Sequence, residues 1–519
     1  MPAESPQPQA AAVPSSWPSE AARKAAYSTV AEEEVHQLPV AVRGCLPPWL
    51  HGSFLRNGPG NYDGMDHLFD GFSLLGKFEL DGATNSVTAS HRFLQSVAYQ
   101  HFRRTGRLKW REVGTPRPHD NLWDAVLDVA QTLLGVLGWG DGVTDNASVS
   151  LVPQPNGRCL ALTETLPGTF LVDVASLATL ERVRYKDGIR GDITTAHPTL
   201  LPNGDLINFL STVRLNHWVG GGFTLYRQAA ADPYTRQRLA QIPPRHAFAP
   251  AWVHDFPSSL NYTVIPEMPL YFNLWTLLTG AKNEHMFMDW KPEEGSLIHI
   301  VSHKTGQVKC FRAPPFFVFH WANAWESEDG RYLFLDGAVY DDARVVGDLY
   351  LAPVRAGYSQ GQGISQSHYR RLKIDLLAPN GSEVGSDWEL LVADESSYGH
   401  FCEFPAVSPT CRGRPYRFAY ATCATRPTNA GNSLVKFDNQ LRTCKVWHEP
   451  GSLVGEPIFV PTPGPAGQAE DAGAVLATLT QADGMTALLV LDGVTFEETA
   501  RAVLPYSLPS GFHGCFVPA

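Results

Sequence analysis

The sequence lacks several features that mark other classes of protein. No segment is both long enough and free enough of charge to cross a bilayer as a helix. Basic side chains are outnumbered, with 41 lysines and arginines against 52 aspartates and glutamates, and the net charge of −11 disfavours a nucleic-acid partner. Charged residues make up only 18% of the chain and hydrophobic residues 44%, a balance that predicts a large packed core rather than a disordered protein.

Cysteine is sparse as well. None of the eight cysteines has a neighbour at the spacing of a thiolate zinc motif, and eight are too few for a disulfide scaffold in a chain of 519 residues. We therefore interpret them as reduced and mostly buried thiols, which fits an intracellular compartment.

Glycine and proline are abundant, with 45 and 40 residues, and they would interrupt long helices. Several segments instead share one arrangement, which is an apolar run ending in Asp, a short turn and a second apolar run. Residues 77–93 and 488–504 are two of them, and each is typical of a β-hairpin. Because this unit recurs along the chain, the sequence predicts an all-β fold, with a β-propeller favoured over a large sandwich.

We expect a single β-propeller domain over residues 29–519. The first 28 residues are rich in Ala, Pro and Ser, contain no apolar run and are more acidic than a typical plastid transit peptide. They predict a disordered or targeting tail rather than a secretory signal peptide.

One segment, residues 120–140, has the period of a helix. Its polar residues, Asp124 and Asp128 among them, fall on one stripe, and apolar residues occupy the rest of its surface. The internal aspartates are incompatible with a membrane span. Two interpretations stay open, namely a helix packed on the propeller face, or a monotopic patch over Leu122–Trp139 that enters a bilayer to collect a lipophilic substrate.

Four of the 18 histidines lie in apolar, aromatic-flanked segments at expected strand ends, where a solvated imidazole is disfavoured: His197, His254, His320 and His513. They are separated by 57, 66 and 193 residues, so they can meet only on an axis to which distant repeats each contribute a strand. A propeller has such an axis. We interpret most other histidines, His368 among them, as ordinary structural residues.

Burial of four imidazoles together is costly unless a cation binds between them. Iron(II) suits neutral imidazole and leaves exchangeable positions for dioxygen. A buried ligand histidine also requires an acceptor for its second ring nitrogen, and three glutamates in apolar surroundings suit this use: Glu164, Glu403 and Glu456. On the residues alone, an iron site and four unconnected structural histidines are equal alternatives.

The chain resembles the carotenoid cleavage oxygenase family from residue 52 to residue 519. The family's opening strand is similar to GSFLRNGPGNYDGMDHLFDG, and short motifs then follow in the family's order: LTET, AHP, VHDFP, FHWANA, EFP, EPIFVP and HG. Within the family the chain is most similar to the plant-type dioxygenases of strigolactone synthesis, for example in VTDNASV. This ordered set is far more specific than any single motif.

The resemblance implies a seven-bladed propeller with a helical and loop cap over an iron(II) ion on the axis. The iron ligands that it implies are His197, His254, His320 and His513. The carboxylates that it implies as hydrogen-bond acceptors for three of these rings are Glu164, Glu403 and Glu456. It also places Val149 beside a vacant coordination position of the iron.

Aromatic residues near the ligands suit a polyene, which offers only dispersion and π contacts for recognition. The candidates for a substrate tunnel are Phe319, Trp321, Phe401 and Phe512. Core packing is the alternative interpretation for each of them.

The resemblance further implies an enzyme that uses dioxygen to cleave one conjugated double bond of an apocarotenoid into two carbonyl products. Two alternatives are the cleavage of intact carotenoids or stilbenoids by the same site, and a propeller that binds apocarotenoids without turnover. Plastid residence follows from the resemblance as well, with the cytoplasm as the alternative.

Overall fold

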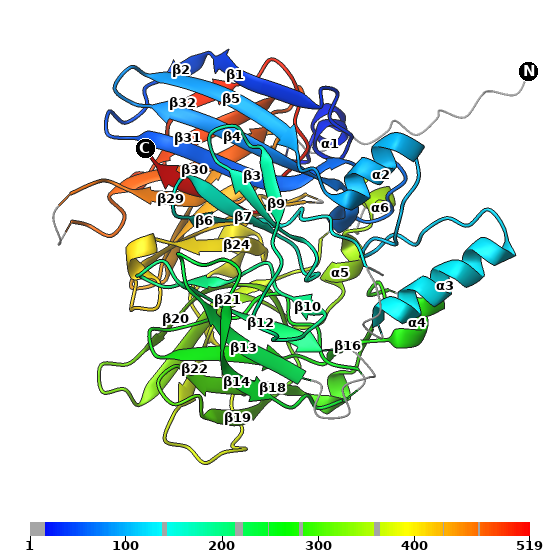
Figure 1. The fold of residues 1–519 in the computed structure, drawn as a ribbon. Coiled ribbons are helices and arrows are strands. Elements are labelled where there is room, and N and C mark those ends of the chain that lie inside the picture. The colour runs from blue at the N-terminus through cyan, green and yellow to red at the C-terminus, as the bar shows by residue number, and fades with distance from the viewer. Residues whose placement is uncertain are drawn as a thin grey trace, which may run out of the picture.

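The computed structural model describes residues 16–136, 143–212, 222–247, 249–279, 284–357, 364–428, 430–464 and 468–519. Within these residues the strands form seven small antiparallel sheets in a ring, which is a seven-bladed β-propeller, and one separate hairpin (Figure 1). The predicted fold class is therefore confirmed.

Each blade is built largely from consecutive strands. Blade one contains β1 (Glu34–Val40), β3 (His51–Asn61), β4 (Phe72–Asp81), β5 (Ser86–Phe93) and β33 (Gly514–Pro518). Blade two contains β6 (Ser150–Gln154), β7 (Arg158–Leu162), β8 (Thr169–Asp173) and β9 (Thr179–Arg182). Blade three contains β10 (Ile193–Thr194), β11 (Thr199–Leu200), β12 (Leu206–Thr212), β13 (Gly222–Gln228) and β14 (Arg236–Ile242). Blade four contains β15 (Tyr262–Glu267), β18 (Ser296–Ser302) and β19 (Val308–Ala313).

The remaining blades follow the same order. Blade five contains β20 (Phe317–Glu326), β21 (Tyr332–Tyr340), β22 (His368–Asp375) and β23 (Glu389–Leu390). Blade six contains β24 (Cys402–Val407), β25 (Phe418–Cys423), β26 (Ser433–Asp438) and β27 (Thr443–His448). Blade seven contains β28 (Leu453–Val454), β29 (Ile458–Pro461), β30 (Gly473–Thr480), β31 (Thr486–Asp492), β32 (Glu498–Val503) and β2 (Val42–Gly44). The separate hairpin is formed by β16 (Leu270–Phe272) and β17 (Met288–Trp290).

The ring is closed from both ends of the chain. β2 pairs with β32 of blade seven, with Val42 opposite Ala502. β33 pairs with β3 of blade one, with Arg56 opposite Gly514. Hydrogen bonds therefore cover strand edges that an open ring would leave exposed. Buried apolar side chains fill the joint between the two blades: Phe54, Phe78, Leu476, Leu488 and Val490.

The helices lie together on one side of the strands, as the expected cap requires (Figure 1). They are α1 (Glu20–Ala26), α2 (Val97–Thr105), α3 (Leu122–Val136), α4 (Leu274–Thr279), α5 (Val345–Asp348) and α6 (Leu351–Ala356). Four short 3-10 helices are also present among the described residues: η1 (Leu68–Asp70), η2 (Pro292–Glu294), η3 (Glu395–Tyr398) and η4 (Pro409–Cys411).

Part of the segment expected as a tail is folded. α1 begins after Ser19, whose side chain caps the helix by accepting a hydrogen bond from the N–H of Ala22. Ala22 and Ala26 are buried, and the N–H of Ser19 donates to the carbonyl of Gly451 at 2.9 Å. The expected tail thus extends no further than residue 15, and residues 1–15 lie outside the described part of the chain.

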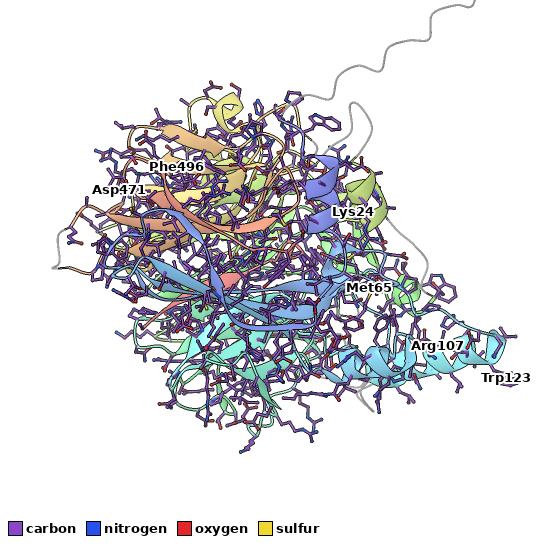
Figure 2. The ribbon with its side chains drawn as sticks, turned by 90° about the horizontal axis from the view of Figure 1, so that it is seen from above. Lys24, Met65, Arg107, Trp123, Asp471 and Phe496 are labelled. Carbon is purple, nitrogen blue, oxygen red and sulfur yellow. The ribbon has the colours of Figure 1, made fainter. Side chains whose placement is uncertain are left out.

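The expected helical insertion is α3, and residues 137–140 of that segment lie outside the described residues. Its polar stripe faces the protein, because Asp128 is only 3% exposed and one of its oxygens lies 3.1 Å from Nε2 of His119. Leu122 and Trp123 are instead 80% and 78% exposed. Figure 2 shows Trp123 at the outer end of the helix, away from the strands. α3 therefore docks through its polar stripe and leaves apolar residues uncovered.

Among the residues that the structure describes, no helix combines the length and the apolar character needed to cross a membrane.

Gly514 offers a test of the ring closure. A Cβ atom added there would lie 2.0 Å from the backbone oxygen of Leu55 in β3, so backbone would have to move. We expect Gly514→Ala to lower the free energy of unfolding by about 1–3 kcal/mol, as overpacking does elsewhere, measured from the urea midpoint.

Gly76→Ala in β4 is the matched control, because the nearest atom to its added Cβ is Cβ of Arg56 at 3.9 Å. We expect its effect to stay within about 0.5 kcal/mol. Equal urea midpoints for the two variants would contradict the close contact between β33 and β3.

Candidate metal centre

The four candidate histidines meet at the centre of the ring. His197 lies between β10 and β11, His254 precedes β15, His320 lies in β20 and His513 directly precedes β33. The ring centroids are 4.4 Å apart for His197 and His513, and 4.7 Å apart for His197 and His254. One ligand atom from each of the four residues lies within 4.8 Å of the others. Blades three, four and five and the closing strand thus bring together the side chains that the sequence singled out.

Backbone hydrogen bonds fix the positions of these residues. The Thr195 hydroxyl donates to the carbonyl of His254 and accepts from the N–H of His197 at 3.1 Å. The N–H of His513 donates to the carbonyl of Val149 at 3.1 Å. Val149 therefore lies next to the cluster.

Three carboxylates hold three of the rings. Glu164 accepts a hydrogen bond from Nδ1 of His254, Glu403 from Nδ1 of His320 at 2.6 Å, and Glu456 from Nδ1 of His513 at 2.8 Å. An ionised carboxylate only accepts, so Nδ1 of each ring carries a proton and Nε2 is the nitrogen left for a metal ion. All three predicted glutamates therefore have the hydrogen-bonding partners expected of them.

Each carboxylate is held in turn by a second donor. The indole N–H of Trp252 donates to Glu164 at 2.6 Å and the hydroxyl of Tyr340 to Glu403 at 2.6 Å. The guanidinium of Arg56 donates to Glu456 at 2.6 Å. The sequence analysis identified none of these donors, although Trp252 stands two residues before a ligand candidate and could have been noticed.

The donor set fits a metal ion. Nε2 of His320 is buried and has no hydrogen-bond partner among the described residues, although a buried polar atom normally has one. Burial and then the neighbouring imidazoles lower the pKa of His197 well below its ordinary value, so its ring is neutral. Nε2 of His197 lies only 3.1 Å from Nε2 of His254. A transition-metal ion would satisfy these converging nitrogens.

An apolar cavity reaches the cluster at His254, His320 and His513. Phe319, Phe401 and Phe512, three of the predicted tunnel residues, line it together with Val149. The lining of the cavity also includes Tyr27 and Leu453. Its walls suit a long apolar ligand with one end or bond near the imidazoles.

Two further aromatic rings in this cavity were missed by the sequence analysis. The Phe69 ring lies 6.3 Å from the His254 ring, and the Phe404 ring lies 4.9 Å from the His320 ring. Phe404 has a φ of +53°, which phenylalanine rarely adopts and which points to a constrained position. Its place directly after Glu403 was the one available signal.

Trp321 does not line the apolar cavity with the other tunnel candidates. It borders a second, more polar cavity that reaches the cluster at His197 and also contains Asp255. The cause is a β-bulge in β20, where Val318 pairs with Val339 but Trp321 pairs with Gly337. The extra residue breaks the alternation of side chains along β20, so Trp321 faces a different cavity from Phe319 although both lie next to His320 in the sequence.

Comparisons with known proteins agree with this geometry. The family model described as retinal pigment epithelial membrane protein matches residues 27–518. From rice (Oryza sativa subsp. japonica), the proteins named carotenoid cleavage dioxygenase 8 homolog A and homolog B, both chloroplastic, are 34% and 37% identical over 507 and 498 residues. These alignments cover 96% and 92% of this chain and 88% and 82% of the relatives. A solved mutant of Synechocystis apocarotenoid oxygenase matches with a TM-score of 0.77 and 25% identity, over 97% of this chain and 100% of that one.

Glu403 provides a test of the hydrogen-bonded carboxylates. Glu403→Gln keeps the size of the side chain but removes one of the two acceptor oxygens that His320 and Tyr340 use. We expect the affinity of the folded protein for iron(II) to fall by about 10- to 100-fold, which is typical when an outer hydrogen-bond partner of a metal ligand is lost. The measurement is a metal titration under anaerobic conditions.

Glu267→Gln is the matched control, since buried Glu267 accepts a hydrogen bond from His299 at 3.0 Å but belongs to no metal-ligand cluster among the described residues. Its iron affinity should equal that of the unaltered protein. An equal loss in both variants would show that the effect of Glu403 is general destabilisation.

Proposed function

Because the chain belongs to the carotenoid oxygenase family, the family of the retinal pigment epithelial membrane protein, we propose that it is an iron(II)-dependent dioxygenase that cleaves a conjugated double bond of an apocarotenoid into two carbonyl products. One observation carries the proposal above all, which is a largely buried cluster of four imidazoles that opens directly into an apolar, aromatic-lined cavity. The names of the rice relatives and of the Synechocystis neighbour support the reaction and the substrate class.

The iron ligands in this proposal are His197, His254, His320 and His513. When bound, iron(II) supplies the activation of dioxygen. The three glutamates behind the rings keep each Nε2 directed at the ion, and their negative charges offset its positive charge in a region of low dielectric.

The substrate is oriented by shape and dispersion rather than by hydrogen bonds. A polyene chain has no polar groups, and the rings of Phe69, Phe319, Phe404 and Phe512 offer it apolar and π surfaces near the imidazoles. Among the described residues, the only carboxylates and imidazoles of this cavity are Glu164, Glu403 and members of the histidine cluster. The chain therefore contributes positioning and exclusion of water, with no separate acid or base.

The test is a reconstitution. The protein is purified without oxygen, loaded with iron(II), assayed for iron per chain, and mixed under air with a β-apocarotenal before the products are identified by mass. We expect about one iron per chain and two carbonyl fragments whose masses locate the cleaved bond. Iron without products from any apocarotenal would overturn the proposed substrate class and favour intact carotenoids or stilbenoids.

Two histidine variants distinguish an enzyme from a propeller that only binds apocarotenoids. His254→Ala should lose both iron and product formation, because it removes one imidazole and leaves Glu164 without its ring partner. His246→Ala is the control, because His246 lies outside the cluster and its Nε2 is 2.6 Å from Oε2 of Glu294. The control variant should retain both iron and product formation. Retention of product formation by the His254 variant would contradict the four-histidine site.

We also propose that α3 and the neighbouring α4 dock on a membrane surface, where a lipophilic substrate is dissolved. Their exposed side chains include Leu122, Trp123 and Leu127, which is 57% exposed, and Trp275 of α4, which is 74% exposed. The two helices lie side by side (Figure 1). A surface of large apolar side chains on elements that project from the strands suits the boundary of a bilayer.

Flotation with phosphatidylcholine vesicles tests this surface. The double variant Trp123→Glu and Leu127→Glu should reduce the bound fraction by about tenfold or more, because burial of each apolar side chain in lipid contributes about 2 kcal/mol. The control is the double variant Leu377→Glu and Leu441→Glu, two side chains that are 74% and 64% exposed on other elements. Equal binding of both double variants would overturn the proposed surface.

Plastid residence is part of the same proposal. The rice relatives are named chloroplastic, and carotenoids are made and stored in plastids. Localisation of a tagged full-length chain in plant cells tests it, and a cytoplasmic signal would overturn it.

A further inference from the structure

A second group of metal-binding side chains lies outside the central cluster. His368 begins β22 of blade five, while Glu395 is the first residue of η3 and His400 follows that helix before blade six. Each residue offers one ligand atom, and the three atoms lie within 4.8 Å of one another. Nδ1 of His368 and Oε1 of Glu395 are 2.8 Å apart. Nothing in the sequence connects His368 with the other two residues.

The backbone holds the three residues together by a tight turn at the end of η3. The N–H of His400 donates to the carbonyl of Glu395 at 3.0 Å, and the N–H of Gly399 donates to that of Ser396 at 3.1 Å. This is the bonding pattern of a Schellman motif, which brings the two side chains at its ends into contact. Apolar residues usually fill those positions, whereas here they are a carboxylate and an imidazole.

The turn is strained and firmly anchored. Gly399 and His400 both have left-handed backbones, with φ of +73° and +52°. A Cβ atom on Gly399 would lie 1.9 Å from the backbone oxygen of Ala424, so the turn is packed directly against the next strand pair. The carbonyl of His400 accepts from the N–H of Ser367 at 3.1 Å, which brings His368 alongside. A left-handed histidine is uncommon, and such strain gathers at functional positions.

The three side chains are placed where a cation can reach them. The side chains of His368 and Glu395 are 13% and 14% exposed, so solvent ions can reach them although both are largely buried. Oε1 of Glu395 lies 2.8 Å from Nδ1 of His368 and accepts a hydrogen bond from the Tyr398 hydroxyl at 2.7 Å. Neither ring nitrogen of His400 has a hydrogen-bond partner within the described parts of the chain.

One neighbouring cation has its own partner. Arg370 adds positive charge near Glu395, but its guanidinium lies 3.2 Å from the carboxylate of Asp341. The negative charge of Glu395 therefore stays available to a second cation.

We propose that His368, Glu395 and His400 bind a second divalent transition-metal ion of the zinc class, separate from the four-histidine centre. Two imidazoles and one carboxylate form a usual zinc donor set, with a water molecule in the remaining position. On binding, the metal replaces the hydrogen bond between His368 and Glu395. The proton of the His368 ring then resides on the nitrogen that does not bind the metal.

The position of this ion gives it a structural consequence. His400 is followed directly by Phe401, which lines the apolar cavity, and by Glu403, which holds His320. An ion bound at His400 therefore fixes one end of the short segment that carries both residues. We expect zinc to raise the melting temperature of the iron-loaded protein, because a ligand that binds only the folded state stabilises it.

The experiment is a zinc titration of the iron-loaded protein without oxygen, with both metals measured after gel filtration. The unaltered protein should gain about one zinc ion per chain and keep its iron. His400→Asn and Glu395→Gln should each weaken zinc binding by about tenfold or more while iron is retained. Asn accepts the left-handed backbone at position 400 and Gln keeps an acceptor oxygen for Tyr398, so both variants are suited to fold.

His246→Asn is the matched control, because His246 also pairs with a glutamate but has no third ligand among the described residues. Its zinc binding should equal that of the unaltered protein. The proposal is overturned if no zinc binds beyond the control level, if zinc is gained only as iron is lost, or if the two ligand variants bind zinc normally. The iron content reports on the proposed catalytic site separately, so failure of one proposal leaves the other testable.

Discussion

Four imidazole rings whose nitrogens crowd together within 4.8 Å of one another are the constraint on which the rest of this structure depends. The rings held by Glu164, Glu403 and Glu456 cannot relieve the repulsion by turning, because a carboxylate fixes Nδ1 of each. Each carboxylate is itself a buried charge that requires a further donor, and Trp252 and Tyr340 supply two of these donors. The polar network therefore extends outward from the centre, and each layer is required by the one inside it.

The histidines and the glutamates of this network could be predicted from the sequence, but the residues that donate to the glutamates could not. A histidine or glutamate in an apolar strand is unusual, because burial of its polar side chain is costly without a partner. Each of these residues could therefore be identified from its own local sequence. Tyr340 and Arg56 could not, because they reach glutamates 63 and 400 residues away along the chain. Trp321 was misplaced for a local reason, since a single extra residue in β20 changes the face on which a side chain lies and leaves no mark in the composition.

α3 shows a different limit of sequence reasoning. Its periodicity predicted correctly that the helix has one polar and one apolar side, but periodicity does not say which side meets the protein. In most surface helices the apolar side does. Here Asp124 and Asp128 face Arg117, at 2.6 and 3.6 Å, and these ion pairs seat the helix with the reverse orientation. Arg117 lies in a segment without regular structure, so no periodic pattern in the sequence predicts that it pairs with these aspartates.

The position of His513 also sets the order of events while the chain is being made. This histidine follows the last strand of blade seven and precedes the strand that closes blade one, so it is synthesised after every other member of the cluster. Until that residue has been made, the growing chain can present at most three of the four imidazoles. The complete set of imidazoles therefore assembles only when β33 pairs with β3, so the step that closes the ring is also the step that completes the centre.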